Sequence, residues 1–509
     1  MSDIISVLRR IMPDGFLVGG VIRDSLLKKT SGDIDIALPP QRVKPCALAL
    51  AKQLKAAAFE MDAQFGVWRL VTYKDNIQID LTAFQGKDLK DDLLRRDFTI
   101  NALAYPLTAP FQLDVFASKK QKTQLRLKGL QKKFLIDLTG GAADITAKQI
   151  CLNTPTAFTD DPLRMLRVFR HAAELKFKIT PAVLKQIKKQ APLIVRSAGE
   201  RVQEELKRLF HTPRAYENIV LMEQTGLLTA IFPELEPQRT CAECYYGKGG
   251  VLLHTLLCFK REEWLLENLQ KAFPKYHKKL AAVVTDKALF KMAVLLHDVA
   301  KPTTAKMKDG RLRFFYHEQK GAGMARKILG RLHYSKNDNR LICAMIGAHL
   351  RPSNLASNDV ITDRGAYKFF RDLSEAALPL LLLCWADYTS YITDAQLRRI
   401  LPRSAERLMS IERAQKTANV GKTLRHLQVL HLLFKKYFDS PKKINPTKLI
   451  DGRDVMQVLQ MPPSPKVGEI LEAVSLAQVE GKIKTRPQAL DFMRDNFGKN
   501  TTAQCVQKK

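Results

Sequence analysis

The sequence has no long apolar run, a shortage of acidic side chains and only one closely spaced cysteine pair. No segment offers the roughly 18 uncharged apolar residues that a membrane-spanning helix needs, and no signal peptide precedes Ile4. We therefore expect a cytoplasmic protein that does not cross a membrane. Cys241 and Cys244 have metal-ligand spacing, but no second pair or nearby paired histidines complete a tetrahedral site. The eight cysteines, Cys505 among them, are therefore interpreted as reduced thiols.

The shortage of acidic residues leaves a large positive charge. The 509 residues include 83 Lys and Arg against 51 Asp and Glu, which gives a formal net charge of +32. Such an excess favours binding to RNA or DNA by neutralisation of phosphates and release of counterions. Gly-rich and Ser-rich tracts are also few and 46% of the residues are hydrophobic, which predicts folded structure throughout, divided into several compact units.

Residues 15–37 carry the first candidate site. Their apolar start predicts a short strand that Gly19 and Gly20 end, followed by a polar helical turn and a second strand carrying Asp33 and Asp35. Alternation along a strand points both carboxylates to the same face. Glycines let backbone N–H groups approach a phosphate chain, and paired carboxylates can hold the magnesium that accompanies it. The pattern indicates a nucleotidyl-transfer centre.

Two further strands are expected at residues 67–73 and 76–84, after a helix at residues 47–61. The second strand supplies Asp80. On a strand beside the Asp33 and Asp35 pair, Asp80 would be the third carboxylate of a two-metal site, although an exposed strand aspartate is the alternative interpretation.

The order of these features resembles the DNA polymerase beta type nucleotidyltransferase superfamily. More narrowly, GGVIRDSLL followed by DIDIA resembles the class II tRNA nucleotidyltransferase and bacterial poly(A) polymerase family. The resemblance implies that Gly19, Gly20 and Arg23 lie in the nucleotide-binding site and that Asp33 and Asp35 hold Mg²⁺.

The segment LLRRDFTINALAY, residues 93–105, places two arginines and an aspartate before an expected apolar helix start. In the family that it resembles, the residues at Arg96 and Asp97 contact the incoming nucleotide and its ribose. Asn101 would help to order the same pocket.

A base-reading motif is expected within TDDPLRMLRVFRHAAEL, residues 159–175. On a helix, Asp161 and Arg164 share a face, as do Arg164 and Arg167. A carboxylate beside a guanidinium can accept from the exocyclic amino group of cytosine or adenine and donate to the ring acceptor. The segment resembles the family's nucleotide-selecting Glu-Asp-x-x-Arg motif, with Asp160 in the place of the usual glutamate.

Histidines and aspartates at positions 254–387 form a second constellation. The adjacent His-Asp pair in MAVLLHDVAKP and the further histidines resemble the HD phosphohydrolase superfamily. Imidazole and carboxylate ligands suit manganese, nickel, iron or magnesium and leave positions for water. The resemblance implies a ligand set of His254, His297, Asp298 and Asp387, with His317 and His349 available for a second metal or for phosphate.

The expected fold class is α+β, with a small mixed-sheet nucleotidyltransferase head followed by mostly helical regions. The expected division is a catalytic head (1–137), a neck for nucleotide selection and RNA binding (138–235), an HD-like domain (236–400) and a C-terminal tRNA-binding tail (401–509).

The resemblance implies a template-independent enzyme that adds CCA to tRNA 3′ ends from CTP and ATP. Only LTAFQGKDLKDDLL, residues 81–94, separates the Asp80 strand from Arg95, where CCA-adding members have a longer loop, and Gln85 stands where arginine is common. CC-only addition is therefore equally favoured. A poly(A) polymerase is an alternative, although residues 58–71 lack that group's Gly-Arg-Arg-Phe type element. A metal-dependent phosphohydrolase acting on RNA 3′ phosphates or cyclic phosphates is another. The sequence does not indicate an oligomeric state.

Overall fold

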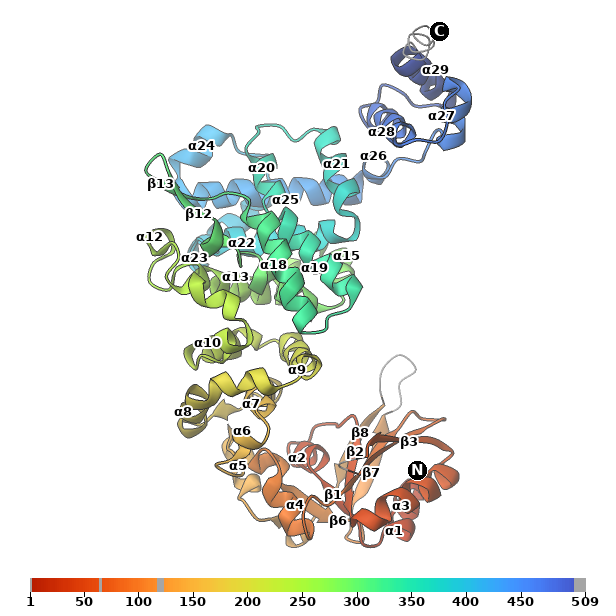
Figure 1. The fold of residues 1–509 in the computed structure, drawn as a ribbon, viewed down its shortest axis with the longest axis vertical. Coiled ribbons are helices and arrows are strands. Elements are labelled where there is room, and N and C mark those ends of the chain that lie inside the picture. The colour runs from red at the N-terminus through yellow and green to blue at the C-terminus, as the bar shows by residue number, and fades with distance from the viewer. Residues whose placement is uncertain (1, 64–65, 117–122, 499–509) are drawn as a thin grey trace, which may run out of the picture. The chain divides into compact units, whose positions relative to one another are not determined.

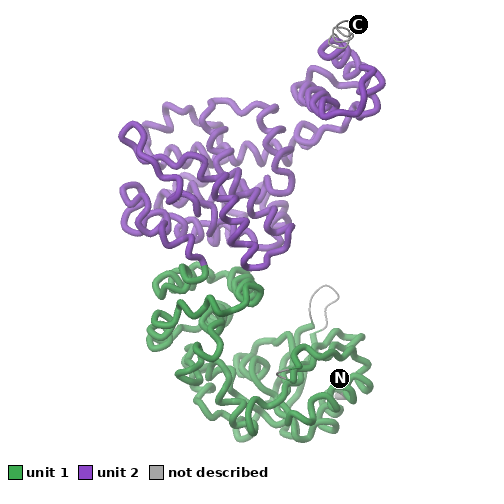
Figure 2. The backbone as a smooth tube through the Cα atoms, in the orientation of Figure 1, with its two compact units in different colours: residues 1–231 green, residues 232–509 purple. Residues whose placement is uncertain are grey.

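The computed structural model describes residues 2–63, 66–116 and 123–498, so Cys505 lies outside the described residues. The chain divides into two compact units, residues 1–231 and 232–509 (Figure 2). The four-part domain division expected from the sequence stays a prediction. No described helix is long and apolar enough to cross a membrane.

A seven-stranded mixed sheet with the order β3-β4-β5-β2-β1-β6-β9 forms the head of the first unit (Figure 1). The central strands β2 and β5 are parallel, whereas β1 pairs antiparallel with β2 and with β6. A separate antiparallel pair, β7 and β8, and a short parallel pair, β10 and β11, complete the strands of this unit. The strands are β1 (Phe16–Val18), β2 (Ile34–Leu38), β3 (Ala56–Asp62), β4 (Val67–Thr72), β5 (Gln78–Ala83), β6 (Leu103–Pro106), β7 (Gln112–Phe116), β8 (Gln124–Lys128), β9 (Ile136–Asp137), β10 (Gln149–Ile150) and β11 (Lys178–Ile179).

Helices surround the sheet and continue beyond it to the end of the first unit. They are α1 (Ser2–Ile11), α2 (Gly20–Leu26), α3 (Pro40–Leu54), α4 (Leu89–Arg95), α5 (Gly141–Ala147), α6 (Ala157–Asp160), α7 (Leu163–Leu175), α8 (Pro181–Gln190), α9 (Gly199–His211), α10 (Ala215–Gln224) and α11 (Leu227–Ile231), with 3₁₀ turns η1 (Thr99–Asn101), η2 (Lys132–Phe134) and η3 (Ala191–Arg196).

The strands expected at residues 16–18, 67–73 and 76–84 are confirmed as β1, β4 and β5. The helix expected at residues 47–61 is wrong in its second half. Helix α3 ends at Leu54 because Lys55 adopts a left-handed conformation (φ 49°), and the following residues form β3 against β4. The helix start expected after Asp97 is also wrong, since only the single turn η1 forms before strand β6.

The described residues of the second unit form helices apart from one antiparallel hairpin, β12 (Ala305–Lys308) and β13 (Arg311–Phe314). The mixed-sheet head with a helical remainder confirms the expected α+β class. The helices of this unit are α12 (Glu243–Tyr246), α13 (Gly250–Glu267), α14 (Leu269–Ala272), α15 (His277–Val283), α16 (Lys287–Leu296), α17 (Lys301–Thr304), α18 (His317–Arg331), α19 (Lys336–Ala348), α20 (Arg351–Ala356), α21 (Asp363–Leu373), α22 (Ala377–Thr389), α23 (Asp394–Ile400), α24 (Ile411–Lys416), α25 (Ala418–Asp439), α26 (Pro441–Ile444), α27 (Gly452–Leu459), α28 (Pro465–Val479) and α29 (Arg486–Phe497), with 3₁₀ turns η4 (Pro233–Arg239), η5 (Ser374–Ala376) and η6 (Leu401–Ala405).

Helix α5 packs closely on η1, the turn that carries Asn101. A Cβ atom added at Gly141 would lie 2.1 Å from the backbone oxygen of Thr99, so no side chain fits there without a backbone shift. We expect Gly141→Ala to lower the free energy of unfolding of the first unit by about 1–3 kcal/mol through overpacking. Thermal unfolding measures the change. Gly323→Ala on the exposed face of α18, where nothing lies within 4 Å, is the control and should be neutral or slightly stabilising; equal effects of the two substitutions would contradict the packing argument.

Candidate active site

Gly19 lies where the backbone passes between two of the expected site residues. It precedes α2 with a φ of 70°, a conformation that favours glycine. A Cβ atom at this position would lie 3.2 Å from Nη1 of Arg96 and 3.6 Å from Oδ2 of Asp35. Gly20, the first residue of α2, likewise lies close to Arg23, whose Nη2 would be 3.6 Å from an added Cβ. The glycine pair, two guanidinium groups and a carboxylate thus occupy one small region of the head.

Two of the three expected metal-binding carboxylates lie side by side. Asp35 on β2 and Asp80 on β5 are register partners in the parallel pair, so their side chains leave the same face of the sheet. Asp33 lies one residue before β2 rather than within it. Burial, followed by the charges of Asp33 and Asp80, raises the pKa of Asp35 to about 7. A divalent cation would offset this repulsion among carboxylates, so the residues present fit a magnesium site.

Asp80 has a partner that the sequence analysis missed. Arg69, its register partner on β4, donates from Nε to Oδ1 at 2.9 Å and from Nη2 to Oδ2 at 2.7 Å. In the described geometry the three carboxylates do not all lie within 4.8 Å of one another. Asp80 is thus charge-paired, and its role as a third metal ligand stays a prediction. The only feature of the sequence that could have indicated this contact was the single arginine within the otherwise mostly apolar segment at residues 67–72.

Four of the expected nucleotide-binding residues form one chain of polar contacts. Arg23 on α2 donates from Nη1 to Asn101 at 2.7 Å, and Asn101 donates from Nδ2 to Oδ1 of Asp97 at 3.1 Å. The other oxygen of Asp97 lies 2.7 Å from Nη2 of Arg167 on α7. Burial alone would raise the pKa of Asp97, but Arg167 and the hydrogen bond from Asn101 outweigh it and lower that pKa. The carboxylate of Asp97 is therefore held ionised.

Arg96 is held by Asp92, which, like Arg69, was not predicted from the sequence. Its Nε and Nη2 both donate to Oδ2 of Asp92, at 3.1 and 2.9 Å, and the other oxygen of Asp92 accepts from the backbone N–H of Gln85 at 3.1 Å. Asp92 is buried on α4. It orients Arg96 toward Gly19 and ties the short segment after β5 to the same region.

The expected arrangement of Asp161 and Arg164 on one helix is wrong. Asp161 follows α6 in an extended conformation, and α7 begins only at Leu163. The Asp161 carboxylate accepts from the backbone N–H of Leu163 at 3.1 Å and from Nη2 of Arg201 at 2.8 Å. Arg164 instead donates from Nη2 to the backbone oxygen of Arg95 at 3.0 Å. The two side chains are not paired with each other, and Arg201 on α9 was not predicted to contact either.

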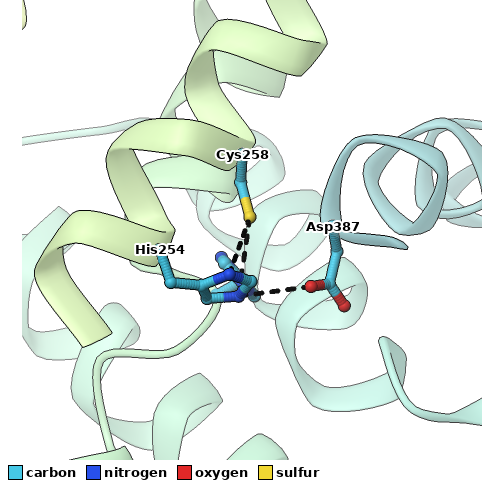
Figure 3. Close-up of side chains that lie close together, drawn as sticks. His254, Cys258 and Asp387 are labelled. Atoms are coloured by element: carbon cyan, nitrogen blue, oxygen red, sulfur yellow. Dashed lines mark hydrogen bonds and ion pairs between the residues drawn. The ribbon is translucent and has the colours of Figure 1, made fainter. Parts of the chain in front are cut away.

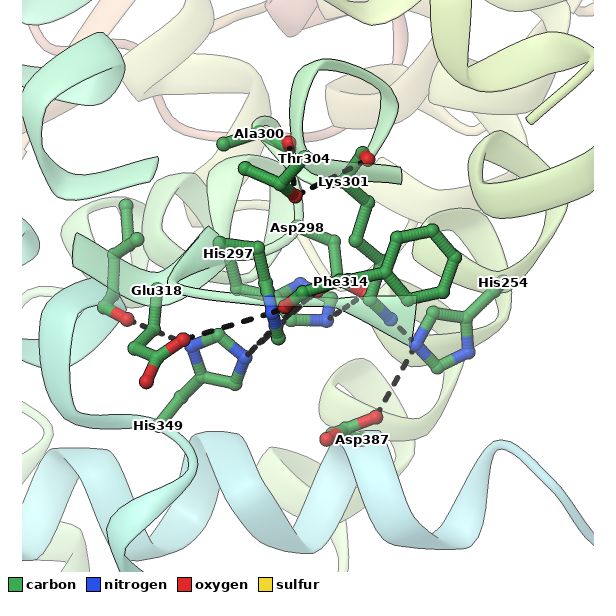
Figure 4. A network of polar contacts seen from close by, with 12 residues as sticks. His254, His297, Asp298, Ala300, Lys301, Thr304, Phe314, Glu318, His349 and Asp387 are labelled. Atoms are coloured by element: carbon green, nitrogen blue, oxygen red, sulfur yellow. Dashed lines mark hydrogen bonds and ion pairs between the residues drawn. The ribbon is translucent and has the colours of Figure 1, made fainter. Parts of the chain in front are cut away.

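The expected HD residues come together in the second unit from α13, α16, α18, α19 and α22 or the ends of these helices. Figure 4 shows His254, His297, Asp298, His349 and Asp387 around the cluster. Asp298 lies at the centre. Its oxygens are 3.3 Å from Nε2 of His254, 3.1 Å from Nε2 of His297, 3.5 Å from Nε2 of His317 and 3.8 Å from Nε2 of His349. His254 also lies 3.2 Å from Oδ1 of Asp387 on α22.

Each of three histidines in this cluster is oriented by its own backbone. Nδ1 of His297, His317 and His349 lies 2.7–2.8 Å from a carbonyl oxygen three residues earlier. If Nδ1 donates to that oxygen, the Nε2 lone pair faces the centre of the cluster, as in histidines that bind metals. Burial alone would lower the pKa of His254, but hydrogen bonds to Asp298 and Asp387 raise it to about 9. Protons thus balance the carboxylates where a metal cation could do so.

Several buried polar atoms converge in the cluster. Nε2 of His297, both oxygens of Asp298 and Oδ1 of Asp387 lie within ion-pair distance of other charged groups but make no hydrogen bond of regular geometry among the described residues. Buried ligand-type atoms that converge in this way are an arrangement that a metal ion can satisfy. In the described chain the ligand atoms form two groups, and within each group all atoms lie within 4.8 Å of one another. The first group comprises His254, Cys258, His297 and Asp387, and the second comprises Asp298, His317 and His349.

Two features of the cluster depart from the expected ligand set. Cys258 lies one helical turn after His254 on α13, with Sγ 3.5 Å from Nε2 of that histidine (Figure 3). Nζ of Lys301 lies 2.5 Å from Oδ2 of Asp298 and competes with a cation for that oxygen. Neither residue was singled out from the sequence, although Lys301 follows the His-Asp pair by three positions.

Comparison with known protein families matches three regions of the chain. The model described as a poly A polymerase head domain matches residues 15–151. A probable RNA and SrmB-binding site of polymerase A matches residues 176–239, and an HD domain matches residues 254–392.

Relatives and solved structures of similar length are found. The A-adding tRNA nucleotidyltransferase of Deinococcus radiodurans is 29% identical over 95% of this chain and 95% of its own. The CC-adding tRNA nucleotidyltransferase of Synechocystis is 26% identical over 96% and 95%. The Thermotoga maritima CCA-adding enzyme complexed with tRNA shares the fold with a TM-score of 0.57 at 18% identity, over 96% of this chain and 94% of that one.

The glycine turn, the carboxylates and the matched head domain together define a nucleotidyltransferase. More narrowly, the first unit matches the head and RNA-binding regions of poly(A) polymerases, the second unit matches an HD domain, and the chain is similar over nearly its whole length to tRNA nucleotidyltransferases.

We expect Mg²⁺ to raise the melting temperature of the first unit in the wild-type protein but not in Asp35→Asn, because the substitution removes a carboxylate of the cluster. Without a divalent cation, Asp35→Asn should be the more stable protein at pH 8, since it relieves the burial of a third negative charge beside Asp33 and Asp80. Thermal unfolding with and without Mg²⁺ measures both effects. The exposed residue Asp62 on β3 supplies the control Asp62→Asn, which should keep the Mg²⁺ response of the wild type. An undiminished response in Asp35→Asn would contradict the assignment.

Proposed function

We propose that the protein is a template-independent nucleotidyltransferase that extends the 3′ end of tRNA from CTP, ATP or both. The observation that carries the proposal is the meeting of Gly19, Arg96 and Asp35 at the end of β1. There a triphosphate can approach the backbone and a guanidinium group, next to a carboxylate that would hold the accompanying Mg²⁺. The names of the full-length relatives support tRNA as the acceptor.

In this proposal the head residues bind and orient the two substrates. Asp33 and Asp35, with Asp80 once Arg69 releases it, would hold Mg²⁺, which activates the RNA 3′ hydroxyl and stabilises the departing pyrophosphate. Arg96, fixed by Asp92, donates to phosphate oxygens. Arg23 and Asp97 line the nucleotide and ribose pocket. Asn101 contacts both of these residues, and Arg167 contacts Asp97.

Base selection is assigned to Asp161 and Arg164. For the two to read one base edge, Asp161 must exchange its contact with Arg201 for the exocyclic amino group of cytosine or adenine. Arg201 is exposed, so releasing this ion pair costs little. Uracil presents an oxygen at that position and would be rejected.

The added nucleotides remain to be assigned among CC, CCA and a single A. The segment between β5 and α4 spans only residues 84–88 and is tied down by the contact of Gln85 with Asp92. A short, anchored segment in place of a longer loop favours CC-only addition, whereas the relative from Deinococcus radiodurans is named for A addition.

The test uses tRNA that lacks CCA, or that ends in CC, with labelled CTP and ATP. We expect wild-type incorporation and a loss of at least about 10³-fold in Asp33→Ala/Asp35→Ala, because the metal-binding carboxylates are gone. Sequencing the 3′ ends identifies the added nucleotides. Asp62→Ala/Asp75→Ala, which also removes two head carboxylates, should leave incorporation within about twofold. If Asp33→Ala/Asp35→Ala incorporates as well as the wild type, the assignment is wrong, and long oligo(A) on arbitrary RNA would instead indicate a poly(A) polymerase.

A second function is supported by the convergence of buried histidine, cysteine and carboxylate atoms in the HD cluster. We propose a metal-dependent phosphohydrolase acting on RNA 3′ phosphate or 2′,3′-cyclic phosphate ends. His254, His297, Asp298 and Asp387 would hold manganese, nickel, iron or magnesium, which supplies an activated water. His317 and His349, whose Nε2 atoms lie 3.2 Å apart, are placed to hold a second metal or the phosphate. Lys301 must then leave Asp298 and is free to neutralise the phosphate.

We expect the wild-type protein to bind a divalent transition metal and to release phosphate from RNA 3′ phosphate ends. His297→Ala should lose most of both, because it removes a buried ligand. Elemental analysis gives the metal content and phosphate release gives the activity. His277→Ala, in the same unit but outside the cluster, should behave as the wild type. A wild-type protein that stays metal-free, or that releases no phosphate when loaded with metal, would exclude this function.

A further inference from the structure

The hairpin of β12 and β13 concentrates positive charge on one face. Its register pairs Lys306 with Arg313 and Lys308 with Arg311, and alternation sends these four side chains to the same side. All four are exposed, and in the described part of the chain none has a carboxylate within salt-bridge distance. We refer to these four residues as the basic face of the hairpin.

In the described chain no acidic side chain offsets the positive charge of the basic face, whereas a solvated surface normally mixes charges of both signs. Like charges directly opposite each other across two strands destabilise the pairing, and an isolated two-stranded hairpin is only marginally stable. Tyr245 on α12 holds this hairpin in place, since its hydroxyl accepts from the N–H of Leu312 at 3.0 Å and donates to the oxygen of the same residue at 3.2 Å. A repulsive arrangement that is anchored from outside fits a surface that binds a polyanion.

Exposed aromatic rings continue the basic face. Phe315 is 45% exposed and Tyr316 is 71% exposed, and Nζ of Lys308 lies 5.5 Å from the centre of the Phe315 ring. Tyr316 has a φ of 59°, which is strained for a residue with a side chain. Aromatic rings beside cations are how proteins hold unpaired nucleotides, because every base has a face that stacks. Duplex nucleic acid would leave these rings unused.

The start of β12 and the end of β13 both lie close to the HD cluster. Lys301, which contacts Asp298, lies on the short helix α17 that leads directly into β12. Phe314 ends β13, and its ring centre lies 6.4 Å from that of His317. A chain bound along the hairpin would thus have an end close to the histidines.

We propose that the β12–β13 hairpin is a docking surface for the single-stranded end of an RNA. The four cations of the basic face bind successive phosphates, Phe315 and Tyr316 stack with bases, and the RNA end lies toward the HD cluster. The inference rests on the proposed function in one respect, namely that RNA is the substrate.

The test measures binding of a labelled single-stranded RNA oligonucleotide to the full chain by fluorescence anisotropy at several salt concentrations. The variant Lys306→Gln/Lys308→Gln/Arg311→Gln/Arg313→Gln should bind at least about tenfold more weakly. The slope of log Kd against log salt should fall by about 3, from roughly 0.7 for each of four lost phosphate contacts. Phe315→Ala should weaken binding about tenfold with an unchanged slope, since stacking carries no charge.

The control removes the same charge elsewhere in the second unit. Lys278→Gln/Lys287→Gln/Lys327→Gln/Lys336→Gln changes four exposed lysines and should alter Kd by less than about threefold. Lys306→Arg/Arg313→Lys keeps the charge and should bind as the wild type. Mass spectrometry of RNA carrying a photoreactive base at its 3′ end should place crosslinks within residues 305–317.

The proposal is overturned if the hairpin and control variants bind RNA equally, if the crosslinks lie elsewhere, or if an acidic polypeptide displaces the RNA at far lower concentration than unlabelled RNA does. That last outcome would indicate a protein partner.

CTP incorporation into tRNA by the wild type is measured in parallel. If incorporation is absent, the proposed function fails whether or not the hairpin binds RNA; if incorporation is present and the variants match, only the hairpin proposal fails.

Discussion

Asp97 is buried at the centre of the contacts that join three segments of the first unit. It accepts from Asn101 on η1 and pairs with Arg167 on α7, and Asn101 in turn accepts from Arg23 on α2. A buried carboxylate that loses its cation costs several kcal/mol, so these segments must stay together for the charge to remain paired. The same requirement places four nucleotide-binding candidates in one region. Stability of the head and preorganisation of its site thus depend on the same side chains.

The two candidate sites hold negative charge in different ways. In the head, burial and then the charges of Asp33 and Asp80 raise the pKa of Asp35, and Arg69 pairs with Asp80. In the HD cluster, His297, Lys301 and His254 contact one carboxylate, so the pKa of Asp298 falls well below its usual range despite burial. A cation in the head would offset repulsion among carboxylates, whereas a cation in the HD cluster would have to replace the contact of Lys301 with Asp298.

Much of the fold was predictable where a pattern is local. The apolar run before Gly19 and the strand patterns in residues 67–73 and 76–84 predicted β1, β4 and β5 correctly, and the expected neighbourhood of Asp80 and Asp35 is confirmed by the register of β5 and β2. The helix expected at residues 47–61 was partly wrong, because the left-handed conformation of Lys55 and the pairing of β3 with β4 overrode a run of helix-favouring residues. Arg69 was missed because only its partner on the neighbouring strand distinguishes it from an ordinary surface charge. Asp92 was missed because its contact with Arg96 resembles an ordinary i,i+4 ion pair, and only its burial and its contact with Gln85 set it apart.

The sequence by itself indicated the resemblance to tRNA nucleotidyltransferases, the order of the head, RNA-binding and HD regions, and the residues proposed for the chemistry, because the spacing within short motifs can be read without knowledge of the fold. Only the tertiary structure decided which charges meet. It paired Asp80 with Arg69 and Asp161 with Arg201, brought Cys258 and Lys301 into the HD cluster, and gathered four cations on one face of a hairpin. Coulomb and hydrogen-bond energies depend on distances between atoms, and the folded chain sets those distances between residues that the sequence keeps far apart.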